Sequence, residues 1–153
     1  MKKIKLTQGK YAIVDDKDFE YLNQFKWSFS GRYAQRVSRG KHIYMHRLIL
    51  DFPSGVDIDH INCDKLDNRK SNLRVCTRSQ NNANLPKPSH NTSGYKGVSW
   101  DKRACKWVAR LNKDGKLRFS KHFDNKLDAA KAYNEKITEM FGSFAKLNNI
   151  KEI

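Results

Sequence analysis

The chain has 153 residues, and its 31 Lys and Arg against 16 Asp and Glu give a formal charge of +15 at pH 7. Only 38% of the residues are hydrophobic, which limits the core, but 11% are aromatic, which argues against disorder. No apolar run approaches the roughly 18 residues of a membrane span, and the start lacks the apolar stretch of a secretory signal. We therefore expect a cytoplasmic protein with free cysteines whose partner is a polyanion, nucleic acid first and an anionic membrane surface second.

The positive charge is concentrated at the two ends of the chain. Residues 1–50 hold 11 basic and 4 acidic residues, residues 51–91 hold 6 and 5, and residues 92–153 hold 14 and 7. Clustered carboxylates in the nearly neutral middle oppose phosphate binding unless a cation lies between the two charges. Two interpretations stay open here: a metal site that faces a nucleic-acid backbone, or Asp residues that simply cap loops.

The first 50 residues predict a small α+β unit that presents basic side chains. Residues 4–6 and 11–14 are short apolar runs around Gly9 and predict a hairpin. Residues 15–25 begin with acidic side chains and repeat apolar residues at spacings of three, which predicts a short helix. Turn signals separate three further predicted strands, at residues 27–29, 33–37 and 43–50.

The middle of the chain predicts a strand, a polar loop, a second strand and a short helix. The two strands are expected at residues 56–59 and 73–76. Thr77 and Gln80 have the spacing of a capping box, which predicts that a helix begins directly after Thr77. The following stretch, residues 85–93, contains two Pro and small polar residues and has the composition of a linker.

Beyond the linker the pattern predicts three strands and one amphipathic helix. The strands are expected at residues 97–100, 106–112 and 116–123. Asp114 and Gly115 are a hairpin-turn signal between the second and third strands. Asn125 is placed to cap the helix and Gly142 to end it. The whole chain is therefore expected to be α+β, ending in a three-stranded antiparallel sheet packed on one helix.

The segment VDIDHIN, residues 56–62, contains groups that suit the hydrolysis of a phosphodiester bond. The carboxylate of Asp59 and the amide of Asn81, on the following helix, can supply oxygen ligands to Mg²⁺ or Mn²⁺. His60 can accept a proton from an attacking water, since its ordinary pKa lies near neutrality. The alternative is a surface Asp–His pair with an ordinary hydrogen bond.

Residues 46–81 resemble the HNH endonuclease family, in its phage and intron-encoded homing branch. The matching segments are MHRLIL, VDIDHIN, NRKSNLR and T-x-x-x-N. That family cleaves DNA with a ββα-metal motif and one divalent ion, so the resemblance implies a site-specific DNA endonuclease. By motif position it implies that Asp59 and Asn81 bind the metal and that His60 is the general base. Asn72 matches the central Asn, which steadies the loop and orients the base.

Several positions leave alternatives open. The third motif position is Asn rather than His, which favours Mg²⁺, and a one-residue shift would move this ligand role to Asn82. Asn68 is a second candidate for the central structural role. Arg47 is expected to bind a phosphate. His46 beside it either belongs to the local framework or forms a hydrogen bond with the backbone. A structural zinc site is not expected, because a fourth ligand is missing.

Residues 92–148 resemble the plant ethylene-response-factor (APETALA) type of DNA-binding domain. The matching segments are YKGV, KWVA, FD, AA-x-AY and AKLN. In that family a three-stranded sheet enters the major groove and the helix packs on its back, so the resemblance implies a sheet that reads DNA. The alternative is a solvated basic face. The residues expected to face DNA are Lys96, Trp100, Arg103, Lys106, Arg110, Asn112 and, with its strand register left open, Arg118.

The expected function follows from this division of the chain. The predicted parts are a DNA-contacting unit at 1–50, a nuclease core at 51–85, a linker at 86–93 and a DNA-binding domain at 94–150. The partner is double-stranded DNA, without membrane or protein partner, and one active site in a monomer predicts a nick. The phage resemblance places the protein in the cytoplasm of an infected or bacterial cell. The alternatives are a DNA-binding protein with an inactive nuclease fold and a binder of structured RNA.

Overall fold

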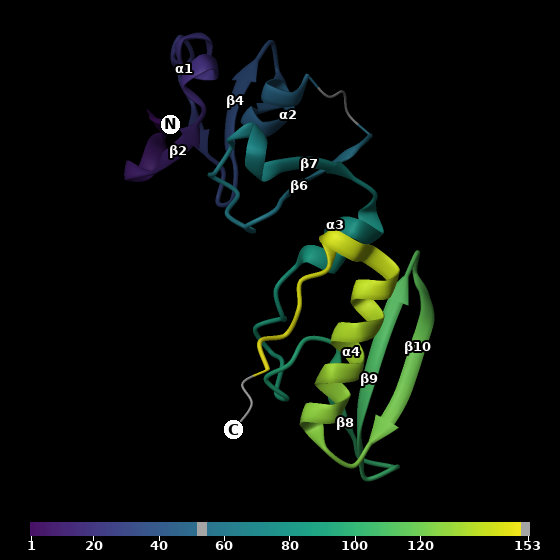
Figure 1. The fold of residues 1–153 in the computed structure, drawn as a ribbon. Coiled ribbons are helices and arrows are strands. Elements are labelled where there is room, and N and C mark those ends of the chain that lie inside the picture. The colour runs from purple at the N-terminus through teal and green to yellow at the C-terminus, as the bar shows by residue number, and fades with distance from the viewer. Residues whose placement is uncertain (52–54, 151–153) are drawn as a thin grey trace. The chain divides into compact units, whose positions relative to one another are not determined.

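The computed structural model describes residues 1–51 and 55–150, which form small antiparallel sheets and short helices (Figure 1). The chain divides into two compact units, unit 1 at residues 1–77 and unit 2 at residues 78–153. The predicted α+β class is confirmed. Within the described part of the chain, no helix combines the length and apolar character that crossing a membrane requires.

Unit 1 begins with the expected hairpin and helix. β1 (Lys2–Lys5) pairs antiparallel with β2 (Tyr11–Val14), and a 3₁₀ turn at Thr7–Gly9 joins them. α1 (Asp16–Asn23) follows at once, with two acidic residues in its first turn, where they favour the positive end of the helix dipole. Leu22 is the residue of α1 that is buried against the hairpin side of the core.

A three-stranded sheet comes next, in the order in which its strands occur along the chain. The strands are β3 (Ser28–Phe29), β4 (Ala34–Ser38) and β5 (Lys41–Tyr44). The strand predicted to run to residue 50 is wrong beyond Tyr44, because α2 (Met45–Leu50) is a helix. Its buried residues Met45 and Ile49 are four apart, so a helix brings both to the core.

The core of unit 1 is formed by apolar side chains from β1, β2, α1, β4 and α2, together with residues further along the chain. Trp27 is buried within it, and its indole Nε1 donates to the backbone oxygen of Leu22 at 2.8 Å, which satisfies the polar atom of a large apolar side chain. The other buried members include Ile4, Leu6, Val14, Ala34, Met45, Ile58 and Leu73.

The last elements of unit 1 form a two-stranded sheet that carries most of the predicted site. β6 (Asp57–His60) pairs antiparallel with β7 (Leu73–Cys76), and a 3₁₀ helix at Lys70–Asn72 leads into β7. Asp59 lies directly opposite Arg74 in this register. Both strands agree with the sequence prediction to within one residue.

The loop between β6 and β7 is attached to the first hairpin. The backbone N–H of Ile13 donates to the oxygen of Leu66, and the N–H of Asn68 donates to the oxygen of Ile13, both at 2.8 Å. A segment of β2 therefore fixes the position of a polar loop that lies far along the chain. This attachment is what holds Asn68 beside the end of β6.

Unit 2 contains the predicted helix–sheet arrangement. Its elements are α3 (Arg78–Asn84), β8 (Val98–Asp101), β9 (Lys106–Lys113), β10 (Lys116–Phe123), α4 (Lys126–Phe141) and a 3₁₀ turn at Gly142–Phe144. β9 lies in the middle of the antiparallel sheet, and α4 runs along it (Figure 1). Asn125 caps α4 as expected, its side-chain oxygen accepting from the N–H of Leu127 at 2.7 Å.

Close approach of α4 to the sheet explains one glycine. Gly97 has a positive φ of +73°, and a Cβ placed on it would lie 2.0 Å from the ring of Tyr133. Only glycine therefore lets the chain enter β8 beneath this ring. The buried side chains that join sheet and helix include Val98, Ala109, Leu111, Ala130, Tyr133 and Ile137.

The units divide after Thr77, so α3 belongs to unit 2. Ala83 of α3 is part of the core of unit 2, and its oxygen accepts from the backbone N–H of Lys146 at 3.1 Å. The ammonium of Lys96 donates to the same oxygen at 2.7 Å. The domain and linker boundaries inferred from the sequence stay predictions.

Candidate active site

Asp59 and His60 are the last two residues of β6, and their exposures are only 1% and 0%. Because neighbouring side chains of a strand point to opposite faces, the two groups have different surroundings. Asp59 meets Arg74 of β7, and His60 meets Asn68 of the loop. Two consecutive residues therefore take part in different interactions. Asp59 belongs to an ion pair with Arg74, whereas His60 forms a hydrogen bond with an uncharged amide.

The imidazole of His60 is neutral at neutral pH. The pKa of His60 is lowered to about 4, chiefly by burial; the hydrogen bond to Asn68 opposes this shift, and Lys65 adds a smaller lowering effect. Nε2 lies 3.3 Å from Oδ1 of Asn68. With the amide assigned in this orientation, its oxygen only accepts, so Nε2 carries the hydrogen and Nδ1 keeps the lone pair. A neutral ring with a lone pair is the form that a general base requires.

Asn72 steadies the loop rather than contacting the base. Its Nδ2 donates to Oδ1 of Asn62 at 3.0 Å and to the backbone oxygen of Asp67 at 2.8 Å. Its Oδ1 accepts from the backbone N–H of Asn62 at 3.0 Å. The two roles that the sequence interpretation gave to Asn72 are thus divided, because it is Asn68 that accepts the hydrogen bond from His60.

A buried ion pair completes the loop. Asp67 is 2% exposed, and Arg69 donates to both of its carboxylate oxygens, from Nε at 2.8 Å and from Nη2 at 2.6 Å. Asn62 also donates to Asp67, from Nδ2 at 2.9 Å. The hydrogen bond from Arg69 holds the pKa of Asp67 below its usual value. The segment reading Asp-Asn-Arg thereby forms a rigid frame around the position of Asn68.

Arg74 is a member of the site to which sequence reasoning gave no role. It donates to Oδ2 of Asp59 from Nη2 at 2.8 Å and from Nε at 3.0 Å. Its position opposite Asp59 follows from the strand register, which the sequence does not state. In the sequence, the only indication of a role for Arg74 was its position two residues after the motif residue Asn72.

His60 belongs to a cluster of aromatic rings. The ring of His46 is 5.3 Å from that of His60, and Tyr33 lies 5.1 Å from His46, measured between ring centroids. Burial lowers the pKa of His46 to about 3, with His60 and Arg47 contributing, so this second histidine is also neutral. His46 therefore belongs to the framework, one of the two readings that its sequence position allowed.

Arg47 of α2 is bonded to the backbone that leads into β6. Its Nη2 donates to the backbone oxygen of Val56 at 2.8 Å, just before β6 begins. The predicted phosphate contact of Arg47 stays a prediction. Its positive charge nevertheless reaches the site, because it lowers the pKa of His46.

Sequences of known proteins match the segment that contains this site. The profile of a family described as HNH endonuclease matches residues 44–83. A protein of Acanthamoeba polyphaga mimivirus, named as an uncharacterized HNH endonuclease, is 32% identical over 150 residues, which are 94% of this chain and 77% of that protein. The chain belongs to the HNH endonuclease family. It is accordingly a hydrolase of the DNA endonuclease class.

A second relative is Protein 3.8 of Escherichia phage T7, which is 34% identical over 94 residues, or 61% of this chain and 77% of that protein. No solved structure matches the chain. The family match ends at residue 83 and therefore does not extend over the sheet of unit 2. The likeness of that sheet to the ethylene-response-factor type is not supported by these matches and stays a prediction.

HNH nucleases generally use a divalent metal, and the donors of this HNH endonuclease suit one. Asp59 offers a carboxylate and Asn81 an amide oxygen, the hard donors that Mg²⁺ and Mn²⁺ accept. Asn81 lies on α3 in unit 2, so its part in the centre stays a prediction, as does the alternative Asn82. Among the described residues, no three or more His, Cys, Asp or Glu side chains gather as a metal site.

Burial also changes the ionisation of Cys76. The pKa of its thiol rises to about 11, chiefly through burial, and Sγ donates to the backbone oxygen of Asp57 at 3.6 Å. Cys76 thus behaves as a small buried side chain at the end of β7. The expectation that the protein has no structural zinc site stays a prediction.

The sheet of unit 2 presents a polar face. Along β9 the side chains of Ala109 and Leu111 pack toward α4, and alternation sends Lys106, Arg110 and Asn112 to the other face. Arg110 and Asn112 are exposed there. Three of the residues expected to face DNA therefore share one open surface.

The remaining residues of that set lie elsewhere. Trp100 is opposite Trp107, with ring centroids 5.2 Å apart, and alternation puts it on the side of Val98, which faces α4. The ammonium of Lys96 is bonded to backbone oxygens near the end of α3. Arg103 is exposed in the turn between β8 and β9, and Arg118 is exposed where the register between β9 and β10 shifts.

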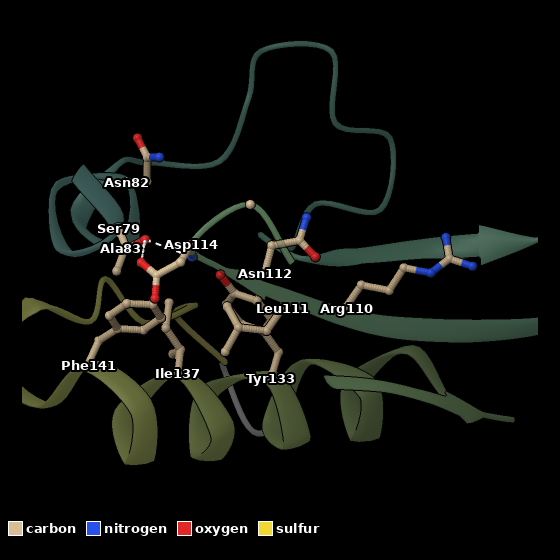
Figure 2. Close-up of a pocket in the computed structure, with 11 residues that line it drawn as sticks. Ser79, Asn82, Ala83, Arg110, Leu111, Asn112, Asp114, Tyr133, Ile137 and Phe141 are labelled. Atoms are coloured by element: carbon tan, nitrogen blue, oxygen red, sulfur yellow. Dashed lines mark hydrogen bonds between the residues drawn. The ribbon is translucent and has the colours of Figure 1, made fainter. Parts of the chain in front are cut away.

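A separate pocket of about 350 Å³ opens within unit 2 (Figure 2). Its floor is apolar, with Leu111, Ile137 and the ring of Phe141. At its edge the hydroxyl of Ser79 donates to Oδ1 of Asp114 at 2.6 Å. Its described lining includes Asn82, the alternative metal ligand, and Arg110 and Asn112 of the proposed DNA-binding set, but not Asp59 or His60.

Proposed function

We propose that the enzyme is a site-specific, metal-dependent homing endonuclease of the phage and intron-encoded kind that nicks double-stranded DNA. The observation that carries this proposal is the pair formed by a neutral, buried His60 and the adjacent carboxylate of Asp59 at the end of β6. The family supplies the reaction class, hydrolysis of a phosphodiester bond. The spacing of the motif is the basis for the roles proposed for the individual site residues.

In the proposed mechanism His60 removes a proton from the attacking water. Nδ1 holds the lone pair, and the hydrogen bond from Nε2 to Asn68 keeps the ring oriented as positive charge develops on it. Asn72 and Asp67 keep the loop rigid, so that the base does not move away during the reaction. A divalent ion held by Asp59 and Asn81 would stabilise negative charge on the phosphate oxygens.

The proposed DNA contact is the open face of the β8–β9–β10 sheet. Lys106, Arg110 and Asn112 project from alternate positions of β9, a spacing that suits phosphates and base edges in the major groove. The net charge of +15 favours binding through release of counterions, which makes affinity strongly salt-dependent. Sequence preference is assigned to this sheet and cleavage to the HNH motif.

We further propose that the enzyme acts as a monomer without a protein partner, in the cytoplasm of a bacterial or phage-infected cell. One copy of the motif provides one active site, and one active site cuts one strand in each encounter. A double-strand break would need a second copy or a second visit. Mg²⁺ is the expected ion, with Mn²⁺ as a substitute.

The proposal is tested by incubating purified enzyme with a library of supercoiled plasmids, with Mg²⁺, with Mn²⁺ or with chelator. Conversion to open circle at mappable positions, abolished by chelator, is expected. His60→Ala is expected to remove the activity but not the gel shift, and His90→Ala, at an exposed position outside the site, is the matched control. Plasmid that stays supercoiled with either ion while still shifting on a gel would establish the alternative, a DNA-binding protein with an inactive nuclease fold.

A further inference from the structure

The ion pair between Arg74 and Asp59 puts a cation on a proposed metal ligand. Nη2 and Nε of Arg74 lie 2.8 Å and 3.0 Å from the same atom, Oδ2 of Asp59. The two residues face each other directly on β6 and β7, so the backbone register maintains the contact. A guanidinium group and a hard divalent ion bind the same lone pairs of a carboxylate. Both cations cannot use Oδ2 in this way at once.

The two partners are unequally buried. The side chain of Asp59 is 1% exposed, whereas that of Arg74 is 16% exposed. A cation that is to bind Oδ2 must therefore displace the guanidinium, and the side chain of Arg74 is the partner that already reaches solvent. Leaving a buried carboxylate without a counter-charge is strongly unfavourable, so Arg74 stabilises Asp59 for as long as no other cation is bound.

Acidic and basic side chains both lie near the pair: Asp64 raises the pKa of His60, and Asp57 raises that of Cys76. Lys65 lowers the pKa of His60, and Arg47 and Lys65 both lower the pKa of His46. A divalent ion that enters beside Arg74 and Lys65 adds to the positive charge there, and an anion that enters with it offsets this charge. A phosphate of DNA is such an anion, and a guanidinium binds phosphate with the same fork of donors that it uses for a carboxylate.

We propose that Arg74 occupies the cation position at Asp59 in the metal-free enzyme and transfers to a DNA phosphate when a divalent ion takes that position. The inference rests on the proposed function, in which Asp59 is a metal ligand. Metal and DNA then bind with positive coupling, each raising the affinity for the other by the same factor. The enzyme therefore binds the metal weakly in the absence of DNA and tightly when DNA is bound.

The test measures Mn²⁺ affinity by electron paramagnetic resonance, with and without a 20-base-pair duplex. All proteins carry His60→Ala so that the duplex stays intact, and Mn²⁺ bound by the duplex alone is subtracted. Arg74→Gln is compared with the unchanged Arg74 background. Arg69→Gln is the matched control, because Arg69 forms a comparable ion pair with Asp67 in the same loop.

Without DNA, Arg74→Gln is expected to bind Mn²⁺ about tenfold more tightly, since a charge-assisted hydrogen-bonded competitor has been removed. With the duplex this advantage is expected to disappear, while Arg69→Gln follows the background protein in both conditions. Equal or weaker binding by Arg74→Gln without DNA would overturn the inference. If that variant does not fold, Arg74→Met replaces it with the same expected gain in Mn²⁺ affinity, since it also removes the charge. A background affinity for Mn²⁺ that the duplex leaves unchanged would also overturn the inference.

Asp59→Asn separates this inference from the proposed function. If Asp59→Asn leaves Mn²⁺ affinity unchanged, Asp59 is not a metal ligand, and the metal assignment of the proposed function fails together with the inference. If Asp59→Asn abolishes binding but Arg74→Gln does not strengthen it, the metal assignment holds and only the role of Arg74 fails.

Discussion

Asn68 and His60 form the contact that decides which ring nitrogen is available as a base. The amide oxygen of Asn68 lies 3.3 Å from Nε2 of His60 and fixes the hydrogen on that nitrogen. The backbone N–H of Asn68 is in turn bonded to Ile13 of β2. The orientation of the proposed base thus depends on the first hairpin of the chain, through a single loop residue.

Removing the acceptor is expected to impair cleavage without weakening DNA binding. Asn68→Leu leaves Nε2 of His60 without its acceptor, and cleavage is expected to fall about 10- to 100-fold, as for other groups that orient a reactive residue. Asn68→Asp keeps an oxygen at the same position and is expected to recover most of the rate. Plasmid nicking and gel shift measure the two properties. Equal losses in both variants would show that Asn68 does not act through His60.

Asn72 is expected to matter first for stability. Asn72→Ala removes three hydrogen bonds from a side chain that is 6% exposed, and leaves partners in the loop unsatisfied. The free energy of unfolding is expected to fall by about 1–3 kcal/mol. Urea denaturation followed by circular dichroism measures the change. Asn23→Ala, at the exposed end of α1 in the same unit, is the control and is expected to have little effect; an equally small effect of Asn72→Ala would contradict the assigned role.

Stability is expected to fall as the pH drops below about 6.5, partly because of His46. Burial lowers the pKa of His46 to about 3, so the unfolded chain takes up the proton first between these two pH values. The contribution of neutral His46 is complete above pH 6.5 and decreases toward pH 3, by at most about 1.4 kcal/mol per pH unit. His60, whose pKa is also lowered by burial, likewise decreases the stability of the folded protein as the pH falls.

His46→Gln is expected to flatten part of this dependence, measured as the midpoint of urea unfolding at several pH values. His42→Gln, at an exposed position of β5, is the control and is expected to leave the slope unchanged. A slope that His46→Gln does not alter would mean that this ring is protonated at little cost in the folded protein.

Arg110 and Lys96 are expected to differ in their effects, although the family resemblance assigns both to DNA. Arg110 is exposed on the open face of the sheet, so Arg110→Ala is expected to weaken DNA binding and to reduce the salt slope by about 1. Lys96→Met is expected to lower the stability of unit 2, because its ammonium bonds the oxygens of Ala83 and Leu85 at 2.7 Å and 2.6 Å.

Fluorescence anisotropy at several salt concentrations and thermal unfolding measure the two effects. Lys116→Ala, in the exposed first position of β10, is the control for loss of charge alone. A reduced salt slope with unchanged stability for Lys96→Met would return that residue to the DNA-binding surface.

Local sequence patterns determined much of the architecture. The strands around Asp59 and Leu73, the start of α3 at Arg78 and the Asn125 cap of α4 all follow from short-range rules of alternation and capping. The motif also led directly to His60. Such features are predictable because their cause lies within a few residues of the chain.

The tertiary structure alone decided the rest. Residues 45–50 form a helix because the core accepts Met45 and Ile49 from one face, and a short apolar run does not reveal this. Arg74 reaches Asp59 only through the strand register, and Asn68 reaches His60 only because β2 holds the loop. In the sequence Lys96 is a basic side chain like those expected to bind DNA. In the structure, however, its ammonium group donates to a backbone oxygen near the end of α3. Hydrogen bonds and ion pairs are short-range interactions, so their partners are set by which distant segments the fold brings within about 3 Å of each other.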